Sequence, residues 1–330
     1  RDPAWVIDHI DQDVPMLIEQ IRTRVLPKRG IVAAPDEILI TLGSQNALYL
    51  LTRLLLSSTT RIGVENPCFR EAINTFLLAD AEVVPHPVDE EGIVLNERPC
   101  DYYYVTPGHQ VPTGVTMSSA RRRQLLEHAA RHDAVIIEDD YDSESNFTLN
   151  PLPALKASDR SGRVVYVSSL SKALSPGLRL GFMVADPDLI DEARALRRLV
   201  YRHPPTNIQY QMAHFLAQGH YETHLRRYHY DSAQRWERLH AALQRYLPSC
   251  RALAGSEHAN AFWLQTPAQI NTQQLTWRAA HAGVLIEPGA RHFLSAAPPD
   301  NYFRMGFHAI NPDAIAQGVE VLRGQLEQMG

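Results

Sequence analysis

A lysine flanked by small hydroxyl residues is the first feature of the chain that could take part in chemistry. Lys172 ends the run Ser168–Lys172, and Arg179 follows seven positions later. A primary amine is a nucleophile that condenses with carbonyl groups. Ser169 can donate a hydroxyl hydrogen and Arg179 two parallel N–H groups, a combination that suits a phosphate. Taken alone, however, the run is typical of an exposed surface lysine.

A cluster of acidic residues directly follows another apolar run. Its sequence is Glu138-Asp139-Asp140-Tyr141-Asp142. Such a cluster at the end of a strand could bind Mg²⁺, but the phenol of Tyr141 is a poor ligand for a hard cation. We therefore predict no metal site. Because side chains alternate along a strand, Asp139 and Tyr141 should face one side and Asp140 the other.

Two further segments follow predicted strands. Gly43-Ser44-Gln45 opens a predicted helix, where free backbone N–H groups and the helix dipole favour an anion. By itself this segment is more typical of an ordinary serine N-cap. The segment Thr106–Gly114 is rich in proline and glycine and is, by itself, simply a rigid turn. Separately, none of the four segments defines a function.

The elements that must position these segments form an α/β pattern. Short apolar runs, several of them continuous, alternate with stretches of helical spacing, as expected of strands covered on both faces. The strands are predicted at 38–41, 61–64, 102–105, 134–137, 164–167 and 181–184, and the helices between them at 46–56, 70–78 and 120–132. This alternation predicts a doubly wound layer, in which ligands bind at the carboxyl ends of the strands.

The pattern changes near Pro204-Pro205, which indicates a second, smaller α+β domain. A helical stretch from about 208 to 246, interrupted near Gly219, precedes strand-like runs at 261–264, 284–286 and 302–305 and a last helix at 312–328. We therefore predict a large domain of residues 33–215. Residues 1–32 and 216–330 should form the small domain, with the N-terminal segment packing against the C-terminal part.

Composition argues against several classes of protein. The 330 residues carry a net charge of -5, which gives no electrostatic reason to expect nucleic acid or a membrane as a direct partner. No apolar run has the length of a membrane span, and no signal-peptide pattern opens the sequence. Three widely spaced cysteines indicate reduced thiols in a cytoplasmic protein. Because the first residue is Arg1 rather than Met, we expect that an upstream segment could be missing.

Together and in this order, the four segments resemble fold-type I pyridoxal 5′-phosphate (PLP) enzymes, the aspartate-aminotransferase superfamily. Within it they are most similar to the aminotransferase-like domain of MocR-type (GntR superfamily) transcriptional regulators. The matching segments are 43–45, 109–114, 138–144 and 169–181, and the resemblance extends from about residue 13 to the C-terminus. It implies a large doubly wound domain with a smaller α+β domain, PLP as cofactor, and a homodimer.

The resemblance also implies catalytic roles. Lys172 would form a Schiff base with PLP, the internal aldimine, because only a primary amine can condense with the aldehyde and later be displaced. Asp139 would lie under the pyridine nitrogen and keep it protonated. Tyr141 would donate a hydrogen bond to the phenolic oxygen of the cofactor.

The remaining site residues would hold the cofactor or its ligand. The phosphate would be bound by Gly43, Ser44, Gln45, Ser169 and Arg179. Phe69 matches the aromatic residue that stacks on the pyridine, although a core phenylalanine at a helix start is an equal alternative. Arg304 matches the arginine that binds a substrate carboxylate, and an arginine inside an apolar strand would be costly to bury without a partner. Val111 stands where many aminotransferases have Asn, so His109 or Gln110 could line the pocket instead.

Two functions of different class follow from the resemblance. In the first, the chain is the effector-sensing and dimerisation domain of a MocR-type regulator, in which an amine or amino-acid effector forms an external aldimine. DNA would then be bound only through a missing N-terminal domain. In the second, the chain is a free-standing PLP-dependent aminotransferase that moves an amino group between an amino acid and a 2-oxo acid. A PLP lyase or decarboxylase is a weaker third possibility. We favour the regulator.

Overall fold

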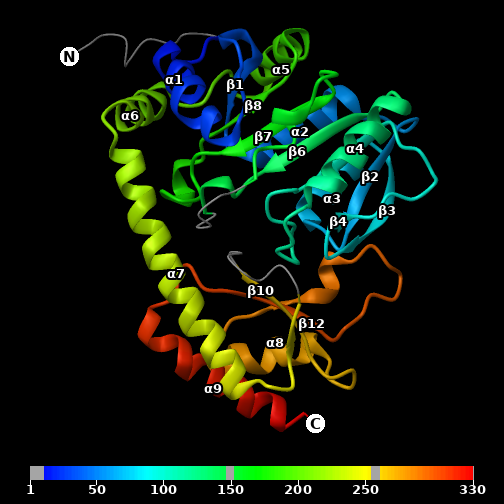
Figure 1. Cartoon of the computed structure of the whole chain (residues 1–330), viewed down its shortest axis with the longest axis vertical. Helices are drawn as coiled ribbons and strands as arrows, with labels where there is room; N and C mark the ends of the chain where they lie inside the picture. Colours follow the sequence, from blue (N-terminus) through cyan, green and yellow to red (C-terminus); the bar gives the residue numbers. More distant parts are fainter. Residues whose placement is uncertain (1–10, 146–151, 254–260, 330) are drawn as a thin grey trace.

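Two separate sheets organise the computed structural model, which describes residues 11–145, 152–253 and 261–329. An eight-stranded sheet lies in the upper part of Figure 1 and a four-stranded sheet in the lower part. The long helix α7 (His220–Tyr246) runs along one side from the first to the second. None of the helices in the described ranges is long and apolar enough to cross a membrane.

The large sheet is mixed, with the strand order β1-β8-β7-β6-β5-β2-β3-β4. Its strands are β1 (Ile38–Thr41), β2 (Arg61–Asn66), β3 (Glu82–Asp89), β4 (Gly92–Ile93), β5 (Tyr102–Val105), β6 (Val135–Asp140), β7 (Val164–Ser169) and β8 (Gly181–Val184). The pairs from β3 through β2, β5 and β6 to β7 are parallel, whereas β8 is antiparallel to both β7 and β1. The carboxyl ends of β2, β5, β6 and β7 therefore meet at one edge of the sheet.

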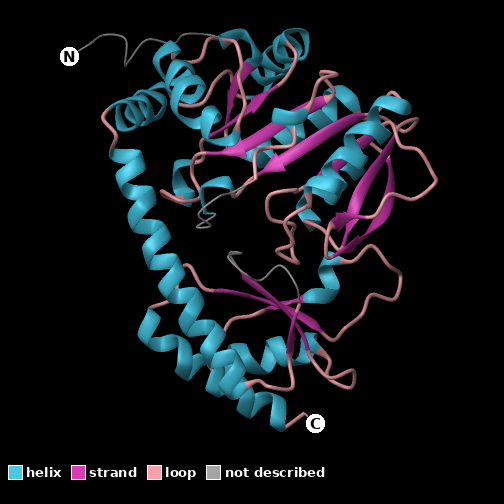
Figure 2. Cartoon of the chain, viewed as in Figure 1, coloured by secondary structure: helices cyan, strands magenta, loops and turns pink. Residues whose placement is uncertain are grey.

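Helices cover both faces of this sheet because successive apolar side chains point to opposite sides. On one face, residues such as Ile137 pack with α2 (Ser44–Leu55), α3 (Arg70–Leu77) and α5 (Pro187–Val200). On the other face, Ile136 packs with α4 (Ser119–Arg131). Figure 2 shows these helices around the strands. The doubly wound layer predicted from the continuous apolar runs is confirmed.

The N-terminal segment covers the rest of the second face. It begins with α1 (Pro15–Gln20), and its buried residues pack on β1, β8, α6 (Thr206–Ala217) and the first turns of α7. Contacts beyond residue 215 in this apolar cluster include Leu216, Tyr221 and Leu225. The segment therefore packs chiefly on the large sheet and reaches the C-terminal part through α6 and the start of α7. The division into 33–215 and 1–32 with 216–330 stays a prediction.

The small sheet is antiparallel, with the order β11-β12-β10-β9. Its strands are β9 (Arg251–Ala252), β10 (Ala261–Gln265), β11 (Glu287–Pro288) and β12 (Tyr302–Gly306). It shares an apolar core with α7, α8 (Thr272–His281) and α9 (Ile315–Glu327). The strand predicted at 284–286 was wrong: Leu285 is 83% exposed, and the strand begins at Glu287.

Local chemistry sets several helix boundaries. The Ser118 side chain accepts a hydrogen bond from the Arg121 backbone N–H at the start of α4. At the start of α8, the Asn271 side chain accepts one from the Gln274 backbone N–H. Gly219 separates α6 from α7 in a left-handed conformation, with φ of 75°. The interruption predicted in the long helical stretch is thus confirmed at Gly219.

Candidate cofactor site

A cavity of about 410 Å³ lies where the predicted site residues meet. It is lined by Gly43, Ser44, Gln45, Phe69, Asp139, Tyr141, Ser169, Lys172, Arg179 and Arg304. Further lining residues, which the sequence had not singled out for the site, include Tyr104, Glu71, Glu287 and His292. The folded chain therefore brings every predicted site residue to one cavity. Their individual roles toward a cofactor stay predictions.

One end of the cavity offers donors for an anion. The N-cap of α2 is Gly43, which has no side chain to cap the helix, and residues 43–45 at this helix start line the cavity. The free N–H groups and the dipole of a helix start favour an anion. A Cβ on Gly43 would lie 3.2 Å from Nη2 of Arg179, and that nitrogen donates to the Leu42 carbonyl at 3.4 Å. The guanidinium thus lies against the backbone of the loop, where glycine leaves room for it.

Strand β8 passes very close beneath this loop. A Cβ on Gly181 would lie 2.7 Å from the Gly43 carbonyl carbon and 2.7 Å from the Ser168 carbonyl oxygen. Both neighbours are backbone atoms, so a side chain at position 181 would have to move one of two elements. Glycine here lets the loop at residue 43 and the strand that leads to Lys172 approach each other.

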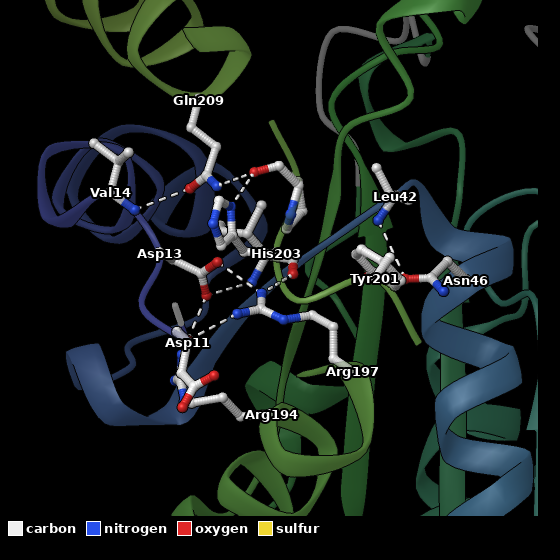
Figure 3. Close-up of polar contacts among 12 residues, drawn as sticks. Asp11, Asp13, Val14, Leu42, Asn46, Arg194, Arg197, Tyr201, His203 and Gln209 are labelled. Carbon is white, nitrogen blue, oxygen red and sulfur yellow. Dashed lines mark hydrogen bonds and ion pairs between the residues drawn. The ribbon is translucent and has the colours of Figure 1, made fainter. Parts of the chain in front are cut away.

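A buried polar network supports the strand that leads into the same loop (Figure 3). Arg197 is fully buried and donates to Asp13 Oδ1 at 2.7 Å and to the Ile40 carbonyl at 2.6 Å. Asn46 Oδ1 accepts from the Leu42 N–H at 3.2 Å and from the Tyr201 hydroxyl. These bonds tie the N-terminal segment, α5 and α2 to the backbone on either side of Thr41. Sequence reasoning missed this network.

Lys172 is held by its neighbours rather than by a helix or strand. The Ser171 hydroxyl donates to the Leu180 carbonyl at 2.9 Å and accepts from the Leu180 N–H at 2.6 Å, which fixes the turn. The Lys172 Nζ lies 3.9 Å from the centre of the Tyr141 ring and 3.6 Å from Asp142 Oδ1. Burial in the cavity lowers the pKa of Lys172, although the Asp142 carboxylate opposes that shift. A larger fraction of the amine is therefore neutral and nucleophilic.

Asp139 is buried at the end of β6, with 3% of its surface exposed. Its Oδ2 accepts from the Tyr104 hydroxyl at 2.9 Å, whereas Oδ1 has no hydrogen-bond partner among the described residues. Burial raises the pKa of Asp139 to about 7, against the hydrogen bond from Tyr104. Asp140 points to the other side, where Arg29 Nε and the Tyr166 hydroxyl each donate to it at 2.7 Å. The predicted alternation along this strand is confirmed.

The polar side chains of the loop 106–114 bond both to one another and to the end of β2. The Gln110 amide donates to the Pro67 carbonyl at 2.7 Å and accepts from the Thr113 hydroxyl at 2.6 Å. The His109 carbonyl accepts from the Tyr141 hydroxyl at 3.2 Å, and Val111 lines the cavity. Gln110 therefore shapes the loop, while His109 positions Tyr141 through its backbone.

The opposite wall belongs to the small sheet. Arg304 on β12 pairs directly with Glu287 on β11, and Arg304 Nη1 lies 3.4 Å from Glu287 Oε2. Glu287 Oε1 lies 3.4 Å from His292 Nε2 and 3.5 Å from Arg291 Nη1. The close contact with His292, together with the positive charges of Arg304 and Arg291, lowers the pKa of Glu287 to about 2. The partner that the sequence required for Arg304 is thus a carboxylate of the chain itself.

The two-sheet fold is that of the fold-type I aminotransferases. A family model described as "Aminotransferase class I and II" matches residues 11–322, so the chain belongs to that family. The α-aminoadipate aminotransferase of Thermus thermophilus, solved with N-(5′-phosphopyridoxyl)-L-leucine, superposes with a TM-score of 0.88 at 27% identity. That superposition covers 98% of this chain and 84% of the enzyme.

Within this family the chain is also similar to transcriptional regulators. It is 39% identical to the HTH-type transcriptional regulator TauR of Rhodobacter capsulatus, over 94% of this chain and 65% of the regulator. It is 33% identical to the probable rhizopine catabolism regulatory protein MocR of Rhizobium meliloti, over 97% of this chain and 64% of that protein. The chain thus spans less than two thirds of the length of both regulators, and it is related to the aminotransferase-like part of such proteins.

Proposed function

We propose that this chain binds PLP in the cavity and is the amine- or amino-acid-sensing domain of a MocR-type transcriptional regulator. The observation that carries the proposal is a single cavity with three features. It combines an amine of lowered pKa, a buried carboxylate oxygen without a hydrogen-bond partner among the described residues, and a helix start whose free N–H groups suit an anion. The similarity to the two regulators supports the regulatory class. DNA would be bound only through a segment outside residues 1–330.

The residues present fit PLP. A buried carboxylate oxygen without a partner is costly, and the protonated nitrogen of a pyridine ring would satisfy Asp139 Oδ1. The phosphate fits the start of α2, where Ser44 and Arg179 line the same end of the cavity. When bound, PLP supplies an aldehyde that condenses with primary amines and a ring that withdraws electrons from the attached carbon.

Each side chain has a task that its position allows. Burial disfavours the ammonium form of Lys172, so a larger fraction of its amine is available as the nucleophile. Asp142 can hold the proton on Nζ whenever Lys172 is displaced, since the two groups are 3.6 Å apart. Asp139 holds a proton at the ring nitrogen, and Tyr141 lies against Lys172 in the same cavity.

A free-standing aminotransferase remains the second candidate. It is favoured by the superposition on the Thermus thermophilus aminotransferase and by the presence of all predicted site residues in one cavity. The two candidates differ in whether the freed Lys172 amine acts as a base on the bound ligand. Sensing requires only amine exchange at Lys172 and closure around the ligand; transamination requires repeated proton transfer as well.

The deciding experiment is a titration of the PLP-loaded chain with amines and amino acids, followed by absorbance. A sensor should give a saturable spectral shift and, after addition of a 2-oxo acid, less than one turnover per site over the time in which an aminotransferase completes many. Steady multiple turnover with a common amino acid and oxo acid would instead establish the enzyme. No spectral shift with any amine would contradict both candidates.

We also propose that the chain is a homodimer. Two exposed apolar residues, Leu199 and Val200, lie at the end of α5, and their exposed fractions are 84% and 53%. They directly precede Tyr201, which bonds to Asn46 in the network of Figure 3. Burying these two adjacent apolar side chains against a second chain would be favourable. Light scattering of the PLP-loaded chain at micromolar concentration should give twice the monomer mass, and a stable monomer would contradict the proposal.

A further inference from the structure

The charges on the small-sheet wall of the cavity are already paired with one another. Arg304 contacts Glu287 at 3.4 Å, Glu287 contacts Arg291 at 3.5 Å, and Arg291 contacts Glu71 at 3.5 Å. We call these four residues the charged quartet. Its two guanidinium groups and two carboxylates cancel in formal charge. The wall that should receive a ligand carboxylate therefore offers no surplus positive charge.

Within the quartet, the bond between Arg304 and Glu287 is the most enclosed. Their side chains are 27% and 32% exposed, whereas those of Arg291 and Glu71 are 49% and 42% exposed. Direct cross-strand pairing of β11 with β12 places the two residues opposite each other. A partly enclosed ion pair is less screened by solvent than an exposed one, so the guanidinium is not available without competition.

A histidine also holds Glu287 in place. Its Oε1 lies 3.4 Å from His292 Nε2, and His292 is itself buried and bonded through Nδ1 to the Cys68 carbonyl at 3.0 Å. The His292 ring therefore anchors Glu287 against the large domain. A ligand carboxylate that binds Arg304 would approach this anchored carboxylate and be repelled by it, because like charges at such distances are unfavourable.

We propose that Glu287 is a specificity-determining residue that competes with a ligand carboxylate for Arg304, so that the site favours primary amines without an α-carboxylate. The inference rests on the proposed function, because it takes Arg304 as the carboxylate-binding residue of that site. An amine that lacks the α-carboxylate can reach Lys172 and leave the pair of Arg304 and Glu287 intact. An α-amino acid must first separate the pair.

The first test uses a carboxylate that cannot react with the cofactor. Calorimetry measures the binding of 3-methylbutanoate to the PLP-loaded chain and to its Glu287→Gln variant. Glutamine keeps the shape of the side chain but removes the competing charge, so we expect about tenfold tighter binding by the variant. Glu71→Gln removes the same charge from the rim without contact to Arg304, and it should change the affinity less than about twofold.

The second test uses two amines that differ only by the carboxylate. L-valine and 2-methylpropan-1-amine are titrated against both forms while absorbance is followed. Glu287→Gln should raise the affinity for valine about tenfold relative to the affinity for the amine. If neither compound changes the absorbance, the proposed function fails, whereas calorimetry with 3-methylbutanoate still decides the role of Glu287.

Each remaining outcome is decisive. Equal or weaker binding of 3-methylbutanoate by Glu287→Gln would show that Glu287 orients Arg304 rather than competes for it, and the inference would be wrong. The same holds if neither form binds the carboxylate. Binding that is detectable only in the glutamine variant would support the inference. A gain shared equally by Glu71→Gln would reduce the effect to rim charge and overturn the role of Glu287.

Discussion

The two walls of the cavity differ in how their charges are satisfied. On the large-sheet wall, Asp139 has an oxygen without a partner among the described residues and a pKa raised to about 7, and Lys172 has a lowered pKa. On the small-sheet wall, Glu287 has cationic partners and a pKa lowered to about 2. The first wall gains stability when an added group completes it. On the second wall the charges already pair with one another, and a ligand carboxylate must separate Arg304 from Glu287 in order to bind.

The largest expected effect concerns the first wall. Lys172→Ala should abolish covalent labelling when the PLP-loaded chain is reduced with borohydride, because the nucleophilic amine is gone. PLP should still bind through Ser44, Arg179 and Asp139. Peptide mapping by mass spectrometry locates the label. Lys28→Ala, which removes an exposed lysine paired with Glu222, should keep the label, and a label on any other lysine would overturn the assignment.

The next prediction concerns Asp139 Oδ1, which has no hydrogen-bond partner among the described residues. Asp139→Asn removes the charge that would pair with the ring nitrogen, so PLP affinity should fall by about 100-fold, the cost of one charged hydrogen bond in a buried site. A fluorescence titration of the apo chain measures the affinity. Asp36→Asn, at an exposed position on a surface turn, should bind like the parent. An unchanged affinity in Asp139→Asn would mean that Asp139 does not contact the cofactor.

The same carboxyl group should make the apo chain sensitive to pH. The pKa of Asp139 is about 7 in the folded chain against an ordinary value of 3.8, so the folded state holds this proton more tightly. Its stabilising contribution is complete below about pH 3.8 and is lost as the pH rises through 7. The free energy of unfolding should therefore fall as the pH rises from about 4 to about 7.

Urea unfolding at several pH values measures this fall. In Asp139→Asn it should be smaller by on the order of 1–3 kcal/mol, and saturating PLP should reduce it as well. Some dependence should persist, because burial also raises the pKa of Glu65 and Glu138 to about 7. If the free energy of unfolding changed equally with pH in the parent and in Asp139→Asn, the raised pKa of Asp139 would be contradicted.

The smallest effect belongs to the second wall. Arg304→Ala should weaken the spectral response to a carboxylate-bearing amine by about tenfold without changing the absorbance of the ligand-free PLP form. The loss is modest because Glu287 already competes for the guanidinium. Arg278→Ala, which removes an arginine of the small domain that bonds to Gln325 and Gln328, is the matched control. A loss of bound PLP in Arg304→Ala would mean that Arg304 also holds the cofactor, which contradicts the proposed difference between the two walls.

The sequence predicted the large sheet better than the small one. Strands β1, β5 and β8 have the predicted bounds, because continuous apolar runs between helices have few alternatives. Strand β6 continues past the predicted end at 137 to Asp140, since the acidic side chains find buried partners there. The apolar run at 284–286 misled the prediction, because a short run of this kind does not need a partner strand.

The sequence predicted cavity residues that stand on recognisable segments, whereas it did not predict those that long-range pairing brings to the cavity. Glu287 gains its role only because β11 pairs with β12 and places it opposite Arg304. Asp13 and Arg197 lie 184 residues apart, and neither stands in a segment with a typical spacing. Residue type and local order therefore predicted the residues of the large-sheet wall. The contacts of the small-sheet wall depend on cross-strand register and burial, which the sequence did not reveal.

The close approach at Gly181 bears on how mutable the protein is. No atom of this residue needs to touch a ligand, yet a single methyl group there would collide with backbone at 2.7 Å on two sides. The start of α2 and the turn before Lys172 would have to separate, and the cavity residues on both segments would shift together. A random mutational scan should therefore find position 181 as intolerant as Lys172, although the defect at position 181 would be steric.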